Sequence, residues 1–292
     1  MTTIPFYRST SVDLVMNILN APAVLAGFKT SLSISLLWIG TMIVLPLLML
    51  CLTVFQLDWS QFWQIIFSQR VLASMLLSFK MALIATLVNI VFGTLVAWSL
   101  VRYRFPGKAL LNTLIDLPFA LPTAVAGIVL ATLYAPNGLI GQLFARFGLQ
   151  IAFSPIGIAI ALVFVSFPFV VRAIQPVLNT LEPALEEAAH ILGASRWQTF
   201  SKVILPSLYP AIVSGAGMGF ARSLGEYGSV IFIAGNIPLV SEIAPLMIMS
   251  KLDIYDVQGA AAVAFAMLLC SFAALLLFNS GQHYLNRHFV SK

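Results

Sequence analysis

Charged residues are scarce in this chain of 292 residues, and their scarcity excludes an ordinary water-soluble domain. Only 9% of the residues are charged, whereas 60% are hydrophobic, and the mean hydropathy is +1.00. Soluble domains carry about 25% charged residues, which cover the surface that faces water. A chain with so few charges has to place much of its surface against lipid. The sequence therefore predicts a membrane protein.

Cysteine, histidine and nucleotide-binding loops are also rare or missing. The chain has two cysteines and three histidines, and Cys51 and Cys270 both fall in apolar stretches, where a buried thiol behaves as a small hydrophobe. Neither a disulfide framework nor a metal site is expected. No phosphate-binding G-x-x-x-x-G-K-[S/T] loop occurs, since Gly107 and Lys108 are followed by Ala109. We therefore expect no cofactor in this chain, and energy from ATP would have to come from another subunit.

Six apolar stretches are each long enough to cross a bilayer, which takes about 20 residues for a hydrocarbon core of roughly 30 Å. The alternating pattern of a membrane β-barrel is missing, so each stretch is expected to be a helix. The fold class is an all-α membrane protein with six transmembrane helices in one domain, residues 31–280, flanked by an N-terminal segment, 1–30, and a C-terminal tail, 281–292. The expected spans are 31–55, 75–101, 111–134, 155–178, 207–234 and 259–279.

The distribution of Lys and Arg predicts the orientation, because loops on the cytoplasmic side carry the excess. With the N-terminus inside, three basic residues lie outside: Arg70, Arg146 and Lys251. The ten on the inside are Arg8, Lys29, Arg102, Arg104, Lys108, Arg172, Arg196, Lys202, Arg287 and Lys292. Both termini and the segment 172–206 are therefore expected in the cytoplasm. The net charge of +5 reports this topology, and no nucleic-acid partner is expected.

The insert between the fourth and fifth expected spans, residues 179–206, is predicted to be a helix, a glycine turn and a second helix. Pro183 suits the first turn of the first helix, and Gly193 suits the left-handed residue that ends it. Ser195 can cap a second short helix, which is expected to end before Pro206.

The first of these helices has small side chains beside a carboxylate. Ala188 and Ala189 follow Glu187 directly, so this part of the helix is narrow. Such a helix fits a groove on another protein, with its carboxylate placed to meet an Arg or Lys at the edge. The insert is therefore predicted to dock on a soluble partner.

The spacing of residues in this insert resembles the EAA loop of ABC importer permeases. Glu187-Ala188-Ala189, three residues, Gly193, nine residues, Val203, one residue and Leu205-Pro206 follow that pattern, with Val203 in place of the usual Ile. The resemblance implies the type I ABC importer permease fold and a coupling helix seated in a cleft of an ATPase subunit. It implies these coupling residues: Glu186, Glu187, Ala188, Ala189, Gly193, Ala194, Leu205 and Pro206.

A second patch, residues 222–230 with the sequence RSLGEYGSV, resembles the T-type permease subunit of sulfate/thiosulfate importers, as do residues 116–122 and 168–178. The resemblance implies a heterodimer with a W-type permease, two copies of an ATPase that binds ATP and Mg, and a periplasmic sulfate-binding protein, all at the bacterial inner membrane. Molybdate and tungstate permeases share the EAA loop and a related patch, commonly with Phe where Tyr227 stands. Import of molybdate or tungstate stays open as the alternative.

Ionisable groups inside the expected spans are candidates for the translocation pathway, because charges at that depth are costly and usually face a bundle interior or a wet cavity. The candidates are Lys80, Arg222, Ser223, Glu226 and Tyr227. Arg222 and Glu226 have two interpretations. They can form an i,i+4 pair that neutralises itself and fixes helix packing, or Arg222 can face the pathway as a transient donor to an oxyanion. Asp116 is expected to act as a cap or to pair with a basic loop residue.

Two other classes of function fit the chain less well than a transport subunit. An intramembrane enzyme needs a constellation of His, Ser or Asp inside its spans, and no such spacing occurs. A passive channel needs rings of polar residues along a pore and has no use for a docking helix. We therefore expect a permease that is not itself an enzyme.

Overall fold

The computed structural model describes residues 27–289, and all regular structure within that range is helical. The described chain divides into two compact units at the junction of Gln56 and Leu57. Most of the predicted N-terminal segment, 1–30, lies outside the described residues, as does the end of the predicted C-terminal tail.

The first unit is a single long helix made of α2 (Phe28–Ile39), η1 (Gly40–Val44) and α3 (Leu45–Phe55). The stretch Phe28–Phe55 is long and apolar enough to cross a membrane, and its many Leu, Ile and Trp side chains would be costly to expose to water. This helix confirms the first expected span.

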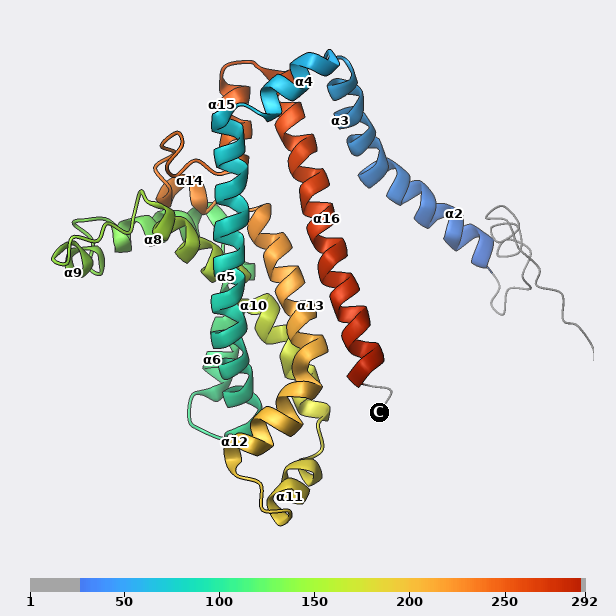
Figure 1. Cartoon of the computed structure of the whole chain (residues 1–292), viewed down its shortest axis with the longest axis vertical. Helices are drawn as coiled ribbons and strands as arrows, with labels where there is room; N and C mark the ends of the chain where they lie inside the picture. The colour runs from blue at the N-terminus through green and yellow to red at the C-terminus, as the bar shows by residue number, and fades with distance from the viewer. Residues whose placement is uncertain (1–26, 290–292) are drawn as a thin grey trace, which may run out of the picture. The chain divides into compact units, whose positions relative to one another are not determined.

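The second unit is built around four helices: α5 (Gln69–Arg102), α10 (Pro155–Thr180), α13 (Leu205–Leu224) and α16 (Val257–Phe289) (Figure 1). Small residues let three of them approach closely. A Cβ at Gly215 of α13 would lie 2.8 Å from the Cβ of Ala173 on α10, and one at Gly93 of α5 would lie 3.0 Å from Val170. Close backbone approach through small residues is the usual way in which membrane helices associate.

Five expected spans correspond to long apolar helices. Besides Phe28–Phe55, these are Gln69–Arg102, Pro155–Thr180, Arg196–Leu224 and Val257–Gly281, which match the second, fourth, fifth and sixth stretches.

The third expected span, 111–134, is not one helix, and this prediction was wrong in detail. It consists of α6 (Lys108–Ile115), α7 (Leu117–Ala120) and α8 (Thr123–Tyr134). Pro122 has no N–H for a helical hydrogen bond, and it holds the preceding Leu121 in an extended conformation with ψ at 133°. The stretch is apolar enough for a span, but its prolines divide it.

The fifth expected span, 207–234, has different ends in the structure. The second helix of the insert does not stop before Pro206: α12 (Arg196–Thr199) continues through the π-helical turn η2 (Phe200–Ile204) into α13. The wider π turn lets the chain enter the segment with Pro206 without ending the helix. At the other end α13 stops at Leu224, and residues 225–234 hold a separate short helix, α14 (Val230–Ile233).

Shorter helices join these elements. Within the described residues they are α4 (Trp59–Ile66), α9 (Gly141–Ala145), α11 (Pro183–Ile191) and α15 (Ala244–Asp253). α11 and α12 lie at the same end of the second unit as α6 and the end of α5, and α4 and α15 lie at the opposite end (Figure 1).

Candidate functional site

The insert 179–206 begins as the sequence predicts. α11 starts with Pro183 at its first position, and Gly193 has φ at 80°, the left-handed conformation that ends the helix. Ser195 then caps α12 through a reciprocal capping box with Gln198. The predicted order of helix, glycine turn and capped helix is confirmed, although the second helix runs on into α13.

Most of the surface of α11 is left uncovered by the described chain. Glu187 and Ala188 are exposed, and the side chains of Ile191 and Leu192 at the end of the helix are 85% and 86% exposed. A carboxylate next to two exposed aliphatic side chains is suited to a protein partner that offers a basic and apolar groove.

The coupling residues named from the sequence do not all lie on one exposed surface in the structure. Glu186 turns back toward the membrane helices, where its Oε1 lies 2.7 Å from Nη2 of Arg102. Ala189 is buried, and Ala194 is half-buried where its N–H donates to the carbonyl of Ala189. Leu205 packs against the core of α5, α10 and α13, and Pro206 follows it in α13, so these two lie outside α11.

Arg222 and Glu226 form an ion pair at the end of α13. Nη1 of Arg222 lies 2.6 Å from Oε2 of Glu226, whose side chain is 2% exposed. The other carboxylate oxygen accepts from the backbone N–H of Ser229 at 2.8 Å and from its hydroxyl at 2.9 Å. Glu226 is thus fully engaged, and it fixes the corner between α13 and α14.

Two glycines let this corner pack tightly against α8. A Cβ at Gly127 of α8 would overlap the carbonyl oxygen of Ser229, and one at Gly228 would overlap the hydroxyl of Thr123. The backbone around Glu226 therefore rests directly on the first turns of α8. The sequence analysis missed this contact, for which the only signal was a glycine on each segment.

Arg222 uses few of its donors within the part of the chain that the structure describes. Among the described side chains its one hydrogen-bonding or ionic partner is Glu226, and its own side chain remains 34% exposed. It lines a cavity of about 390 Å³ together with residues that include Phe169, Ser214 and Met218. These three residues also line a second cavity of about 520 Å³, which reaches Pro210, so both open onto the same face of α13.

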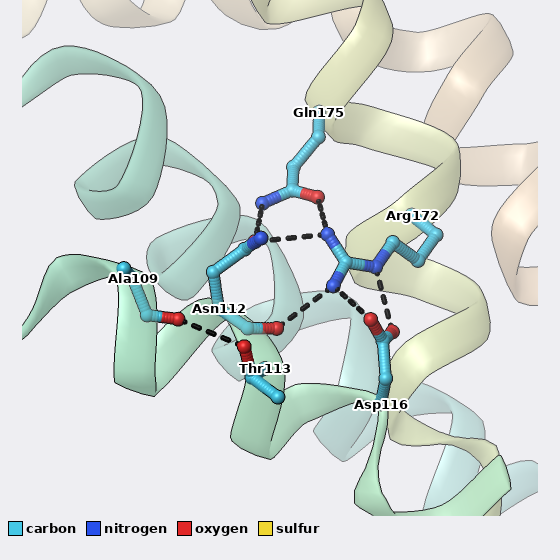
Figure 2. A network of polar contacts seen from close by, with 6 residues as sticks. All are labelled: Ala109, Asn112, Thr113, Asp116, Arg172 and Gln175. Carbon is cyan, nitrogen blue, oxygen red and sulfur yellow. Dashed lines mark hydrogen bonds and ion pairs between the residues drawn. The ribbon is translucent and has the colours of Figure 1, made fainter.

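Arg172 on α10 is engaged at every donor (Figure 2). Its Nε and Nη2 donate to the two carboxylate oxygens of Asp116, at 2.8 and 2.5 Å. Nη1 donates to the side-chain oxygens of Asn112 and Gln175, and Nη2 also donates to the backbone carbonyl of Asn112. Asp116 therefore pairs with a base, as expected, but this base lies within α10 and not in a loop, and the Asp116 side chain makes no capping hydrogen bond.

The remaining pathway candidates are dispersed. Lys80 is exposed on α5, and within the described range no hydrogen bond or ion pair joins it to the other four. Ser223 is buried and its hydroxyl has no partner there. Tyr227 is half-buried against the cluster around Ile158 and Leu162. The structure pairs Arg222 with Glu226 and leaves Lys80 apart.

Two further ion pairs lie at the end of the unit that carries α4 and α15, and sequence reasoning missed both. Arg70 at the start of α5 makes a two-pronged contact with the buried Glu242, with both N–O distances at 2.7 Å. Between α15 and α16, the Lys251 ammonium 2.7 Å from Asp256, helped by the N–H of Gly259, lowers the pKa of the Asp256 carboxyl.

Known proteins resemble this chain over most of its length. A family model described as "Binding-protein-dependent transport system inner membrane component" matches residues 89–291. The "Sulfate transport system permease protein CysT" of Escherichia coli (strain K12) is 48% identical over 267 residues, covering 91% of this chain and 96% of the relative. The protein of the same name from Synechocystis sp. is 47% identical over 262 residues, covering 88% and 92%.

Solved structures share the fold at low sequence identity. A chain from a "bacterial ABC transporter involved in the import of the acidic polysaccharide alginate" superposes with a TM-score of 0.73 at 15% identity, covering 94% of this chain and 98% of that one. A chain from an amino acid ABC transporter gives 0.55 at 18% identity, covering 78% and 99%.

Proposed function

This chain belongs to the binding-protein-dependent transport system inner membrane components, and we propose that it is the T-type permease subunit of an ATP-driven importer of sulfate and thiosulfate. It is a multi-pass membrane protein with the fold of type I ABC importer permeases. The observation that carries the choice of substrate is the 48% identity to a sulfate permease along 96% of that protein. Nothing in these similarities supports molybdate or tungstate as the substrate.

We propose that the chain works in a complex with a W-type permease, two ATPase subunits and a periplasmic sulfate-binding protein. ATP and Mg would bind the ATPase, and both chain termini would lie in the cytoplasm. The exposed surface of α11, with Glu187, Ile191 and Leu192, supports the docking of α11 in the ATPase cleft. Gly193 would hold the helix at the angle that the cleft requires.

We propose that Arg222 is the main contact for the anion inside this subunit. A doubly charged oxyanion crossing a region of low dielectric gains from a fixed cation, yet a strong site would trap it. Arg222 meets both demands, because it lines a cavity, Glu226 is its one partner among the described side chains, and Glu226 neutralises part of its charge. Ser223 and Tyr227 would shape the same corner, and Lys80 would serve as a separate cation on α5.

The test of the whole proposal is uptake of radiolabelled sulfate by proteoliposomes that contain this chain, its permease partner and the ATPase. With loaded sulfate-binding protein outside and ATP inside, we expect sulfate and thiosulfate to enter and molybdate to compete poorly. ATP-dependent entry of molybdate without sulfate would overturn the choice of substrate.

The docking role of α11 has its own test in the same system. Glu187→Lys places a cation where we propose an ATPase Arg or Lys lies, and Gly193→Val forces a β-branched residue into a left-handed conformation. Both variants should insert and pair with the second permease but lose transport. Normal transport by both would show that α11 is not the coupling element.

A further inference from the structure

The guanidinium of Arg102 touches several helix ends near the insert. Arg102 is the last residue of α5, and its Nη2 lies 2.7 Å from Glu186 on α11. The same nitrogen donates to the carbonyl of Leu181, the residue that ends α10, at 3.3 Å. The guanidinium also lies 5.7 Å from the ring centre of Trp98, which packs edge-on against Phe200 of η2. Arg102 thus links the end of α5 to α10 and α11, and the neighbouring Trp98 of α5 contacts η2.

Little else holds α11 in place. Among the side chains of α11 that the structure describes, Ala189 alone is buried. A helix of this length is not stable by itself in water, and most helices are oriented by the packing of an apolar face. The angle of α11 must therefore depend strongly on its two end turns and on the Glu186–Arg102 pair.

The two neighbouring glutamates of α11 face different ways. Glu186 Oε1 is shielded from solvent and interacts with Arg102 by charge without an aligned hydrogen bond, whereas Glu187 is exposed. Successive residues of a helix are separated by about 100° around its axis, so one carboxylate can face α5 while the next faces outward. The first binds within the chain, and the second remains available for a partner.

We propose that Arg102 and Glu186 form an internal latch, by which the coupling helix drives α5 together with α13. This inference rests on the proposed function of α11. α11 leads covalently into α12, η2 and α13, so any movement of α11 reaches α13 through the backbone. α5 has no such connection to α11 in sequence, and the Arg102–Glu186 pair supplies it. Arg102 is thus a positioning residue that makes α5 follow the ATPase.

The experiment measures the number of sulfate ions imported per ATP hydrolysed by the complete importer in proteoliposomes. For Arg102→Gln and Glu186→Gln we expect the ATPase to copurify and to hydrolyse ATP, while the sulfate-to-ATP ratio falls roughly tenfold, a typical size for coupling between sites. Arg104→Gln is the matched control, because Arg104 is an exposed arginine close by without an ion pair in the described chain. It should keep the wild-type ratio.

Reversal of the charges separates a latch from a general loss of folding. The single variants Arg102→Glu and Glu186→Arg should each lower the sulfate-to-ATP ratio. The double variant that combines them should recover part of this loss, because the two charges can again attract each other. A wild-type ratio in both single variants would overturn the latch, and so would a double variant no better than the worse single one. Loss of the copurifying ATPase in Glu186→Gln would also overturn it, since Glu186 would then be a docking residue.

The wild-type complex keeps this result distinct from the proposed function. If the wild-type complex imports no sulfate, the proposed function fails whatever the variants do. If it imports sulfate and the variants keep its ratio, the latch alone fails.

Discussion

Arg172 and Arg222 lie on the neighbouring helices α10 and α13, and they differ in how many of their N–H groups are bound by other residues of the chain. All five N–H groups of Arg172 donate to Asp116, Asn112 and Gln175, whereas Arg222 has a single described partner, Glu226. Their side chains are nearly equally exposed, at 31% and 34%. Exposure therefore does not distinguish the two arginines, and the number of committed donors does.

The difference shows what each arginine can do. A guanidinium that has used all its donors within the protein has none left for an anion, and its removal would leave Asp116 without its partner. Arg172 thus binds the broken third span to α10, since Asn112 and Asp116 belong to α6 and to its junction with α7. A guanidinium with free donors beside a cavity can bind an anion and release it, which is the role proposed for Arg222.

The largest effect should come from Arg172→Gln. Without the guanidinium, Asp116 loses its partner and α6 loses its attachment to α10, so we expect the loss of these charge-assisted hydrogen bonds to cost about 2 kcal/mol of stability. Thermal unfolding in detergent measures this loss. Arg172→Lys should restore only part of it, because an ammonium cannot make the forked contact. An unchanged melting temperature in Arg172→Gln would show that Arg172 does not stabilise the fold.

Arg222→Gln should have its main effect on transport, although it also leaves the buried Glu226 carboxylate with only Ser229 as a described partner and so costs some stability. We expect sulfate uptake to fall about tenfold, equivalent to about 1.4 kcal/mol, while the loaded binding protein still stimulates ATP hydrolysis. The double variant Arg222→Gln with Glu226→Gln decides between the two interpretations of the pair. If it transports as well as the wild type, Arg222 serves only to neutralise Glu226 and has no part in the pathway.

Glu226→Gln should have a smaller effect on transport than Arg222→Gln. The amide oxygen can still accept from Ser229, but Arg222 would no longer be neutralised and should hold the anion more tightly. We expect uptake to fall about threefold, through slower release of the anion. Single-turnover uptake, which separates release from binding, is the measurement. Faster release in this variant would contradict the role given to Glu226.

The smallest effect should be at Asp256. Its ion pair with Lys251 lies away from both arginines and serves as a reference for an exposed pair. Since Lys251 lowers the folded-state pKa of Asp256 below its ordinary value of 3.8, the pair stabilises the fold above that value and loses this effect as pH falls through the lower folded-state pKa. The carboxylate is more than one-third exposed, so Asp256→Asn should cost only about 0.5 kcal/mol at neutral pH. Melting temperatures of this variant and the wild type should converge in acid. A constant difference would contradict the assigned pKa.

Features set by local sequence could be predicted. Long apolar stretches located five membrane helices, and Gly193 and Ser195 located the turn and cap of the insert, because each depends on residues within a few positions. The break at Leu121 was also local, since the prolines were visible. Hydrophobicity along the stretch does not reveal this break, because the residues on both sides of Pro122 are apolar.

Features set by contact between distant segments could not be predicted. Arg172 and Asp116 are 56 positions apart, and which side of each helix faces the other is decided by the packing of small residues such as Gly215 and Gly93. The same limit applies to Glu186. The sequence grouped it with Glu187 as a coupling residue, and only the position of α5 shows that it faces Arg102.

The uninterrupted helix from Arg196 to Leu224 has a mechanical consequence. At about 1.5 Å per residue it is a rod roughly 40 Å long, which begins just after the Gly193 turn and carries Arg222 in its last turn. Because this helix is continuous, a displacement of its first turn can be transmitted along the backbone to its last turn. Displacement at Trp197 would then change the surroundings of Arg222 without any relay of side chains, and the π turn η2 sets where the rod can flex.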